Sequence, residues 1–402
     1  MSTCMSVSLC PRSSAISRET AVAVSLYDTI AAVPEADWLR FIGHDQPLLQ
    51  PAYLQLLEAT LQGEMEFIYA LVRREGRLIG ISYFQVVRFR GSNLTAYFPK
   101  DNEGLKNKLV NLTKGLVAKI DVPLLVSGNL FITGEQGISF LPEYTVQERS
   151  YFLSHTIDHI LAQRKYIKAV LMPDMYEPVG DFDEAFLAYN YKRIYVEADM
   201  SMRLPQEWHS FDDYLAAVTS KYRVRAKKIL STSHQLTSHE LTADQLQDNI
   251  ERAYQLYRNV ADKADFNIAK LPKDYYPQQL RQNPDMYKVF GYFLEGRMVG
   301  FMTLFILPYK TEVHYCGIDY TVNKEHNLYQ RMLYDVVRYA TEHGLRLLHF
   351  GRTAPEVKST IGAIPQPMYG YLRHRNPVVN WLMGFFTGRL KPRDYILRSP
   401  FK

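Results

Sequence analysis

The sequence predicts an α+β protein made of two similar halves, each a mostly antiparallel sheet with one crossover helix. The first observation is a turn that occurs twice, as Glu75-Gly76-Arg77 and Glu295-Gly296-Arg297, 220 residues apart. The second is that β-rich runs flank both turns and that the same order of elements follows each of them. The third is the length, because 402 residues at about 150 per domain suffice for two cores.

The first half opens its repeat with a hairpin. Residues 67–74 and 79–89 are rich in β-branched and aromatic side chains and enclose the first turn, which predicts two antiparallel strands. An apolar strand is predicted at 124–132. Apolar residues then recur at helical spacing over 151–161, and a last strand is predicted at 167–172.

The second half repeats this order of strand, strand, strand, helix, strand. Residues 287–294 and 299–307 enclose the second turn, and a third strand is predicted at 313–318. A helix with an apolar stripe then covers about 327–343 and leads to a strand at 345–350. The repeated order indicates two tandem domains.

Several residues fit helix ends. Asn327 and Gln330 have the spacing of a capping box at the start of the second crossover helix, and Gly344 fits its C-terminal stop. Ser210 fits the N-cap of a helix predicted to continue through about residue 230, and Thr242 with Gln245 opens another.

The join between the halves falls near Pro205. The first twenty residues are polar and serine-rich, with no periodic apolar face to bury. We therefore expect a disordered tail at 1–20, an N-terminal domain at 21–204, a C-terminal domain at 205–376 and an amphipathic tail at 377–402.

Composition excludes several classes of protein. Lys plus Arg (47) exceeds Asp plus Glu (42) by only five, which lacks the basic field of a dedicated nucleic-acid binder. Three cysteines, two of them in the polar tail, cannot build a disulfide framework. No secretory signal or long apolar run occurs in the sequence, so we expect a cytoplasmic protein.

The common local motifs of enzymes are missing from the sequence. No P-loop, nucleophile elbow, zincin helix, EF-hand loop or dinucleotide fingerprint occurs. His155 and His159 stand four residues apart on a predicted helix, but no third ligand accompanies them. We therefore expect no metal site.

Two surface segments have both a functional and a structural interpretation. The basic run of residues 221–228, with Tyr222 as a stacking surface, fits phosphates or an RNA backbone, or else is a solvated helix face. Residues 378–386 are strongly apolar and precede Arg389, Lys391 and Arg393, which is typical of helices that lie on membranes. Packing of this stripe onto the domain is the alternative that we favour, with peripheral membrane contact through 378–393 kept open.

The stretch from 345 to 375 carries most of the chemistry. A strand ending in Gly351-Arg352 places a guanidinium at the carboxyl edge of the sheet, and Lys358 follows on a short helix within reach of the same cleft. The structural alternative is that Arg352 and Lys358 only pair with Glu356 or with carbonyl groups.

At these residues the chain resembles the GNAT acyltransferase superfamily, in its tandem-domain branch with the Fem-type aminoacyl transferases. Three features carry the resemblance: the Ser220-Lys221-Tyr222-Arg223 run, the hairpin at 295–300, and Phe350-Gly351-Arg352-Thr353 leading to Glu356, Lys358 and Gly362. It covers about residues 200–375, and the first half is similar more loosely. The expected fold is therefore two tandem GNAT-like domains.

The resemblance implies an N-acyltransferase that moves an acyl group from a thioester donor to an amine of a cell-envelope or polysaccharide precursor. Lys358 with Gly362 matches the spacing of the Fem-type K-x-x-x-G motif, which implies that Lys358 donates to the oxyanion. Arg352, Glu356 and Tyr369 are the expected substrate-binding residues.

The strand before the crossover helix offers two more candidates. Neighbouring residues of a regular strand face opposite sides, so we expect only one of His314 and Tyr315 to face the cleft. Both are candidate catalytic residues, and His314 is the favoured proton acceptor because imidazole titrates near neutral pH.

The donor is left open. Members that use acyl-CoA carry a glycine-rich loop before the crossover helix, whereas this chain has Lys324, His326 and Asn327 there as the candidate donor-binding residues. An acyl-carrier protein or an aminoacyl-tRNA is the alternative donor, the tRNA using the basic run at 221–228. A binding module that kept the fold without catalysis is the rival of a different class.

Overall fold

The computed structural model describes residues 22–43, 45–91, 115, 121–176, 180–263, 268–387 and 395–402. Side chains at 180–181 and 385–387 are outside this description, as are the tail at 1–20, for which we expect disorder, and the basic residues at 389–393.

The N-terminal half contains the predicted elements in the predicted order, together with further strands and helices. Its strands and helices are β1 (Val22–Tyr27), α1 (Glu35–Leu39), α2 (Pro51–Thr60), β2 (Glu66–Arg74), β3 (Arg77–Arg90), β4 (Asp121–Ser127), β5 (Ile138–Phe140), α4 (Val146–Gln163), β6 (Ala169–Tyr176), α5 (Gly180–Ala188) and β7 (Lys192–Arg203). Helix α4 is the crossover helix, and a capping box between Thr145 and Glu148 starts it.

The C-terminal half repeats the pattern. Its elements are α6 (Phe211–Ala217), α7 (Ser220–Thr232), β8 (Thr237–Glu240), α8 (Ala243–Asp248), α9 (Ile250–Ala261), α10 (Tyr275–Gln282), β9 (Tyr287–Leu294), β10 (Arg297–Ile306), β11 (Thr311–Ile318), α11 (Tyr320–His326), α12 (Leu328–Glu342), β12 (Leu347–His349), α13 (Pro355–Ser359), β13 (Ile364–His374) and α14 (Pro377–Thr387). Helix α12 is the second crossover helix.

The two hairpins confirm the internal repeat. Glu75 and Gly76 both have positive φ, at 53° and 78°, and Glu295 and Gly296 match them at 51° and 77°. Positive φ at both central residues is typical of a type I′ turn. Each hairpin also has a bulge at the same place, between the turn and the glycine that ends the repeated motif.

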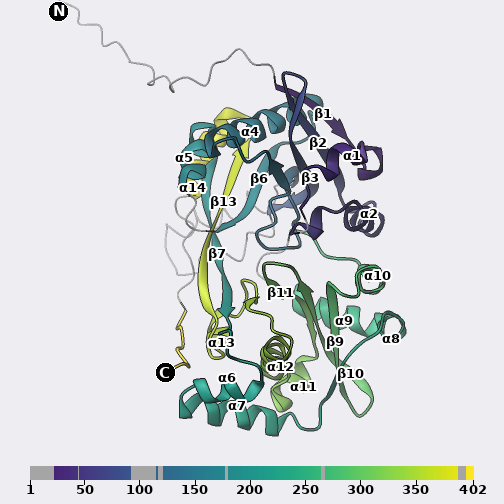
Figure 1. Cartoon of the computed structure of the whole chain (residues 1–402), viewed down its shortest axis with the longest axis vertical. Helices are drawn as coiled ribbons and strands as arrows, with labels where there is room; N and C mark the ends of the chain where they lie inside the picture. The colour runs from purple at the N-terminus through teal and green to yellow at the C-terminus, as the bar shows by residue number, and fades with distance from the viewer. Residues whose placement is uncertain are drawn as a thin grey trace, which may run out of the picture.

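The strands of both halves form one continuous sheet instead of two separate ones. In the described residues its order is β1-β2-β3-β4-β6-β13-β7-β12-β11-β10-β9-β8, with β5 paired to β3. Strand β13, from the end of the chain, lies between β6 and β7 of the N-terminal half, and β7 pairs with β12 of the C-terminal half. Figure 1 shows β7 and β13 running between the two halves.

One predicted helix is divided in two. The Ser210 capping box is present, with Asp213 as its partner, but the helix ends at Ala217. The backbone amide of Thr219 donates to Pro400 O and Val218 bridges to Phe401, so the C-terminal segment interrupts the helical hydrogen bonds. Arg223 then donates to the last carbonyl groups of α6, including Leu215 O at 2.8 Å.

Helix α14 differs from the packing that we favoured. Val378, Trp381 and Leu382 are 64%, 61% and 45% exposed, so the apolar stripe faces away from the protein. Among the described residues, no helix has the length and apolar character needed to span a membrane.

Candidate active site

The centre of the C-terminal half is the point where two parallel strands separate. Strands β11 and β12 pair only at Thr311 with Leu348 and at Glu312 with His349. Beyond this point β11 continues for six residues, and Val313, His314, Tyr315 and Cys316 are partly exposed between buried neighbours. Among the described residues no strand pairs with that edge of β11 beyond Glu312, which leaves backbone groups there for a bound molecule, although the Ile318 carbonyl already accepts from Asn259 Nδ2.

A β-bulge corrects the expectation for His314 and Tyr315. Met302 pairs with Cys316 and Leu304 with Val313, so two residues of β11 stand opposite Thr303 alone. The bulge brings both rings to one face, with their centroids 4.4 Å apart. The Thr303 hydroxyl donates to Tyr315 O and accepts from its amide, which satisfies the displaced backbone.

The His314 ring is held in one tautomer. Its Nε2 lies 3.1 Å from the carbonyl oxygen of Phe131 and must donate to it, because a carbonyl only accepts. Its Nδ1 therefore carries the lone pair, and this buried atom has no hydrogen-bond partner among the described residues. Burial lowers the His314 pKa to about 3, so the ring is neutral at physiological pH.

Lys358 is a buried lysine beside the separating strands. Its side chain belongs to α13, is 3% exposed, and donates from Nζ to Gly351 O at 3.1 Å. Burial lowers its pKa to about 8, against the opposing charges of Asp199 and Glu312. Lys358 is thus a hydrogen-bond donor that remains largely protonated at neutral pH.

Arg352 joins the two halves through an ion pair. Its guanidinium lies 2.8 Å from the Asp174 carboxylate on β6, which is itself buried. A bulge in β6 puts Asp174 in the left-handed region, at φ 56°, and aims its side chain at Arg352. Burial raises the Asp174 pKa, while the positive charge of Arg352 opposes that rise.

A triad of Tyr176, Asp199 and His349, which was not predicted from the sequence, lies where strands of the two halves meet. Asp199 is fully buried on β7 and accepts hydrogen bonds from Tyr176 OH, at 2.9 Å, and from His349 Nδ1. Burial raises the Asp199 pKa, but the hydrogen bond and charge of His349 outweigh this and leave the pKa lowered. The His349 ring is thus oriented with its Nδ1 toward Asp199 and Tyr176.

These three residues come from strands of both halves. Their only sequence signal is polarity inside strands that otherwise read as apolar, at Asp199 between Ala198 and Met200 and at His349 between Leu348 and Phe350. A buried polar residue at a strand position is costly without a partner, and that rule would have selected them.

The loop after β4 docks against this region. Lys310 and Glu312, both buried, form an ion pair at 2.8 Å. Lys310 also donates to Thr133 O, and Glu312 accepts from the Thr133 amide. Lys310 is therefore a structural lysine that attaches the loop of one half to β11 of the other.

The predicted donor-binding residues lie where α11 ends and α12 begins, with Lys324 and His326 in the last turn of α11 and Asn327 at the N-cap of α12. Asn327 adopts φ 51° and makes no side-chain cap, which corrects the expected capping box. The Asn323 Oδ1 atom instead accepts a hydrogen bond from the Tyr329 amide at 2.8 Å. His326 is 7% exposed, while Lys324 is exposed. With no glycine and one amide already occupied, this helix start fits a pyrophosphate poorly.

Glu356 and Tyr369 have their described contacts elsewhere. Glu356 is exposed and accepts from the Ile396 amide of the C-terminal segment. Tyr369 lies on β13 with Arg193 stacked over its ring at 4.6 Å. The structure thus brings Lys358, Arg352, His314 and Tyr315 to the separating strands, whereas the described contacts of Glu356 and Tyr369 are with Ile396 and Arg193.

The basic run on α7 is mostly solvated. Lys221, Arg225, Lys227 and Lys228 are exposed, whereas Arg223 is used to cap α6. Helix α7 packs against α11 and α12, so the exposed charges lie near the start of the second crossover helix. Within the described part of the chain, no cluster of His, Cys, Asp and Glu has the geometry of a metal site.

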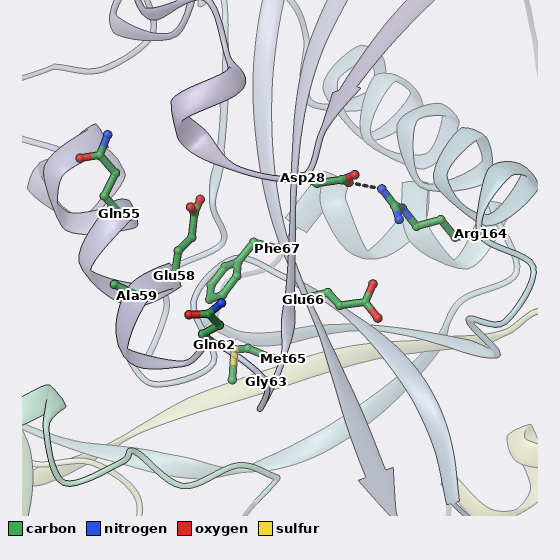
Figure 2. Close-up of a pocket in the computed structure, with 10 residues that line it drawn as sticks. All are labelled: Asp28, Gln55, Glu58, Ala59, Gln62, Gly63, Met65, Glu66, Phe67 and Arg164. Carbon is green, nitrogen blue, oxygen red and sulfur yellow. Dashed lines mark hydrogen bonds and ion pairs between the residues drawn. The ribbon is translucent and has the colours of Figure 1, made fainter.

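A cavity of about 670 Å³ lies in the N-terminal half, between α2 and the start of β2 (Figure 2). Its charged lining residues are already paired with protein groups, because Arg164 contacts Asp28 and Glu58 accepts two hydrogen bonds from residues 29–30. This cavity is separate from the separating strands, and no ligand chemistry follows from it.

The chain matches no protein-family model and no curated protein sequence. Many solved structures resemble it, among them two that each cover 88% of its length. FemX superposes with a TM-score of 0.52 at 12% identity over 98% of its chain, and a tandem GNAT protein from the clavulanic acid biosynthesis pathway with 0.53 at 11% identity over 99%. The likeness establishes the tandem GNAT fold and confirms the expected fold class.

Proposed function

We propose that this protein of the tandem GNAT fold is an N-acyltransferase whose reaction site lies where β11 and β12 separate. The observation that carries the proposal is Lys358, a buried cation with a pKa lowered to about 8 beside the half-exposed edge of β11. A cation in a dry site stabilises the negative charge that develops in acyl transfer.

We assign the two substrates to opposite faces of the sheet. Cys316 packs with the core under α12, whereas Tyr315 packs with the core under α9 and α10. We assign the thioester to the Cys316 side and the amine to the side of His314 and Tyr315. The gap beside β11 then brings the two together, with the unpaired backbone of β11 available to amide groups of a donor.

In the reaction the amine nitrogen bonds to the acyl carbon, and the carbonyl electron pair moves to oxygen. Lys358 donates a hydrogen bond to that oxyanion, and collapse of the intermediate breaks the carbon–sulfur bond and releases a thiolate. The amine proton leaves before or during attack and ends on the thiolate after exchange with a base.

Two imidazoles are candidates for that base. His314 Nδ1 is an available acceptor, but a pKa of about 3 means that it orients the amine more than it retains a proton. His349 Nδ1 is hydrogen-bonded to Asp199, which holds the imidazole in one orientation. We assign orientation to His314 and proton exchange to His349.

Arg352 is the proposed anion-binding group for the substrate, since one third of its side chain is exposed beside the Asp174 pair. Glu356 and Tyr369 are the other proposed substrate-binding residues, and their described contacts are with the C-terminal segment and with Arg193.

A second candidate is aminoacyl transfer from tRNA. The start of α12 fits a pyrophosphate poorly, and the exposed cations of α7 pack beside it, which favours a polyanionic donor over coenzyme A. An acyl-carrier protein, which is acidic in general, would meet the same cations.

The experiment that separates these donors is a thermal-shift series with acetyl-CoA, an acylated carrier protein and charged tRNA, each followed by product detection with amine acceptors. A ligand that binds the native state at 100 times its Kd stabilises it by about 2.7 kcal/mol. Binding of one donor with acyl transfer supports the proposal, and a failure of all three with no transfer favours the non-catalytic binding module.

A further inference from the structure

Helix α14 presents an apolar face to solvent. Val378, Trp381 and Leu382 stand at helical spacing on one side, and each is between 45% and 64% exposed. In Figure 1 the helix lies beside α4 and α5, at the opposite end of the long strands from α13. The proposed reaction site leaves this surface unused.

The orientation of the helix is fixed by its inner face. Asn380 is 6% exposed, accepts from the His374 amide at 2.8 Å and donates to Asn190 O at 2.8 Å. Asn376 caps the first turn by accepting from the amides of Val378 and Val379. With Asn380 held inward, the residues around Trp381 must face outward.

Basic residues lie on one side of this helix. A cavity of about 500 Å³ beside Trp381 is lined by Lys192, Arg373 and Arg375, and its one carboxylate, Asp158, pairs with Arg373. Lys168 is exposed next to it, since the Arg375 amide donates to Lys168 O. An exposed apolar helix with a cationic rim matches the surface of a bilayer that contains anionic lipids.

We propose that α14 and its basic rim, Lys168, Lys192 and Arg375, dock the protein on an anionic membrane surface. The apolar residues enter the boundary between headgroups and acyl chains, and the rim binds lipid phosphates. The proposal does not depend on the acyltransferase assignment, because its test measures lipid binding without a donor or an acceptor.

The test is partition of the full chain into vesicles of phosphatidylcholine alone or with 30% phosphatidylglycerol, followed by co-sedimentation and tryptophan emission. Trp38 and Trp208 are buried, so a blue shift on binding reports Trp381. We expect binding to the anionic vesicles with a blue shift, and loss of both in 0.5 M salt. Absence of binding, or equal binding to the neutral vesicles, overturns the proposal.

Variants locate the surface. W381S/L382S should weaken partition roughly 10-fold or more, because both side chains leave water on docking. V224S, which removes a 67% exposed valine of α7, is the matched control and should bind normally. If the control weakens binding as much as the double variant, the assignment of α14 is wrong.

The contribution of the basic rim is tested by two double variants that reverse the charge of lysines at different places. K168E/K192E should weaken binding to anionic vesicles, whereas K227E/K228E should leave it unchanged. Both double variants make the same change of charge. Equal losses would identify a non-specific cationic surface and overturn the proposal. Dimerisation of the full chain that W381S/L382S abolishes, without vesicle binding, would instead identify a second copy as the occupant. Melting curves of all variants verify folding.

Discussion

At the scale of single residues, two buried lysines, Lys310 and Lys358, differ in the group that each one contacts. Lys310 has a carboxylate 2.8 Å away, whereas Lys358 has a carbonyl oxygen as its described hydrogen-bond acceptor. An ion pair fixes structure, while a cation held by a carbonyl is able to redirect its protons to a substrate oxygen. This contrast distinguishes a structural lysine from a proposed catalytic one.

Arg352→Met should weaken substrate binding and also destabilise the protein. The change leaves Asp174 buried without its cation, which costs about 3 kcal/mol in the free energy of unfolding. The loss in the free energy of unfolding should be smaller at acid pH. Burial has already raised the Asp174 pKa, and protonation removes the unpaired charge. Denaturant unfolding at pH 7.5 and pH 4.5 measures both values.

Arg77→Met is the control for this variant, because the Arg77–Glu143 pair is largely exposed. It should change the free energy of unfolding by less than about 1 kcal/mol. Equal effects of the two variants would show that Asp174 does not depend on Arg352.

His314→Gln should lower turnover roughly 10-fold without moving the pH profile. The loss is that of one orienting hydrogen bond. The pH profile of turnover stays in place because a pKa of about 3 keeps His314 neutral from pH 6 to 9. The decrease in turnover above about pH 8 is due to Lys358, which loses its proton there. Full activity in this range removes His314 from the mechanism, and a shifted midpoint shows that it titrates there.

At the scale of elements, the bulge in β11 places the two aromatic rings together. Thr303→Val should therefore destabilise the protein by about 1–3 kcal/mol, because the Tyr315 amide and carbonyl lose the hydroxyl that satisfies them. Turnover should also fall as His314 and Tyr315 leave their common face. Thermal unfolding and initial rates measure the two effects.

Thr341→Val is the matched control for the bulge. Thr341 is equally buried, but its hydroxyl bonds to Val337 O within α12, a carbonyl that keeps its own helical partner. Thr341→Val should therefore change the free energy of unfolding only slightly. If Thr303→Val is as mild as Thr341→Val, the side chain does not maintain the bulge.

The sequence predicted the elements better than the details of the site. Periodicity and turn chemistry identified both hairpins, both crossover helices and the strand that leads to Lys358, because these signals are local. The bulge at His314 and Tyr315 was missed, since an extra residue in a strand changes neither composition nor period. Asp174 lies 178 residues from Arg352 along the chain and His349 lies 150 residues from Asp199, and no local signal predicts such pairings.

At the scale of the whole molecule, strand exchange makes the halves depend on each other. Strand β13 fills the space between β6 and β7, so the boundary expected at residue 204 separates a sheet from one of its own strands. Neither the length of the chain nor its repeat reveals this exchange, because a repeat predicts like units and does not say which unit holds each strand.

A fragment of residues 22–204 should therefore fail to fold alone. Without β13 it exposes the edges of β6 and β7, which favours aggregation over a stable domain. Circular dichroism and size-exclusion chromatography of the fragment, with and without the fragment 205–402, measure this. A monomer that melts cooperatively by itself would show that the exchange is dispensable.

The central claim is that Lys358 stabilises the oxyanion, and Lys358→Met beside Lys310→Met tests it most directly. We expect Lys358→Met to bind the donor normally, to melt no lower than the wild type, and to turn over about 10²–10³-fold more slowly. Removal of a buried cation with a lowered pKa should even favour folding below about pH 8, an advantage that disappears as the pH rises toward 10.5. Lys310→Met should instead melt lower, because Glu312 is left buried and unpaired. A Lys358→Met protein that is destabilised yet fully active once folded would contradict the account.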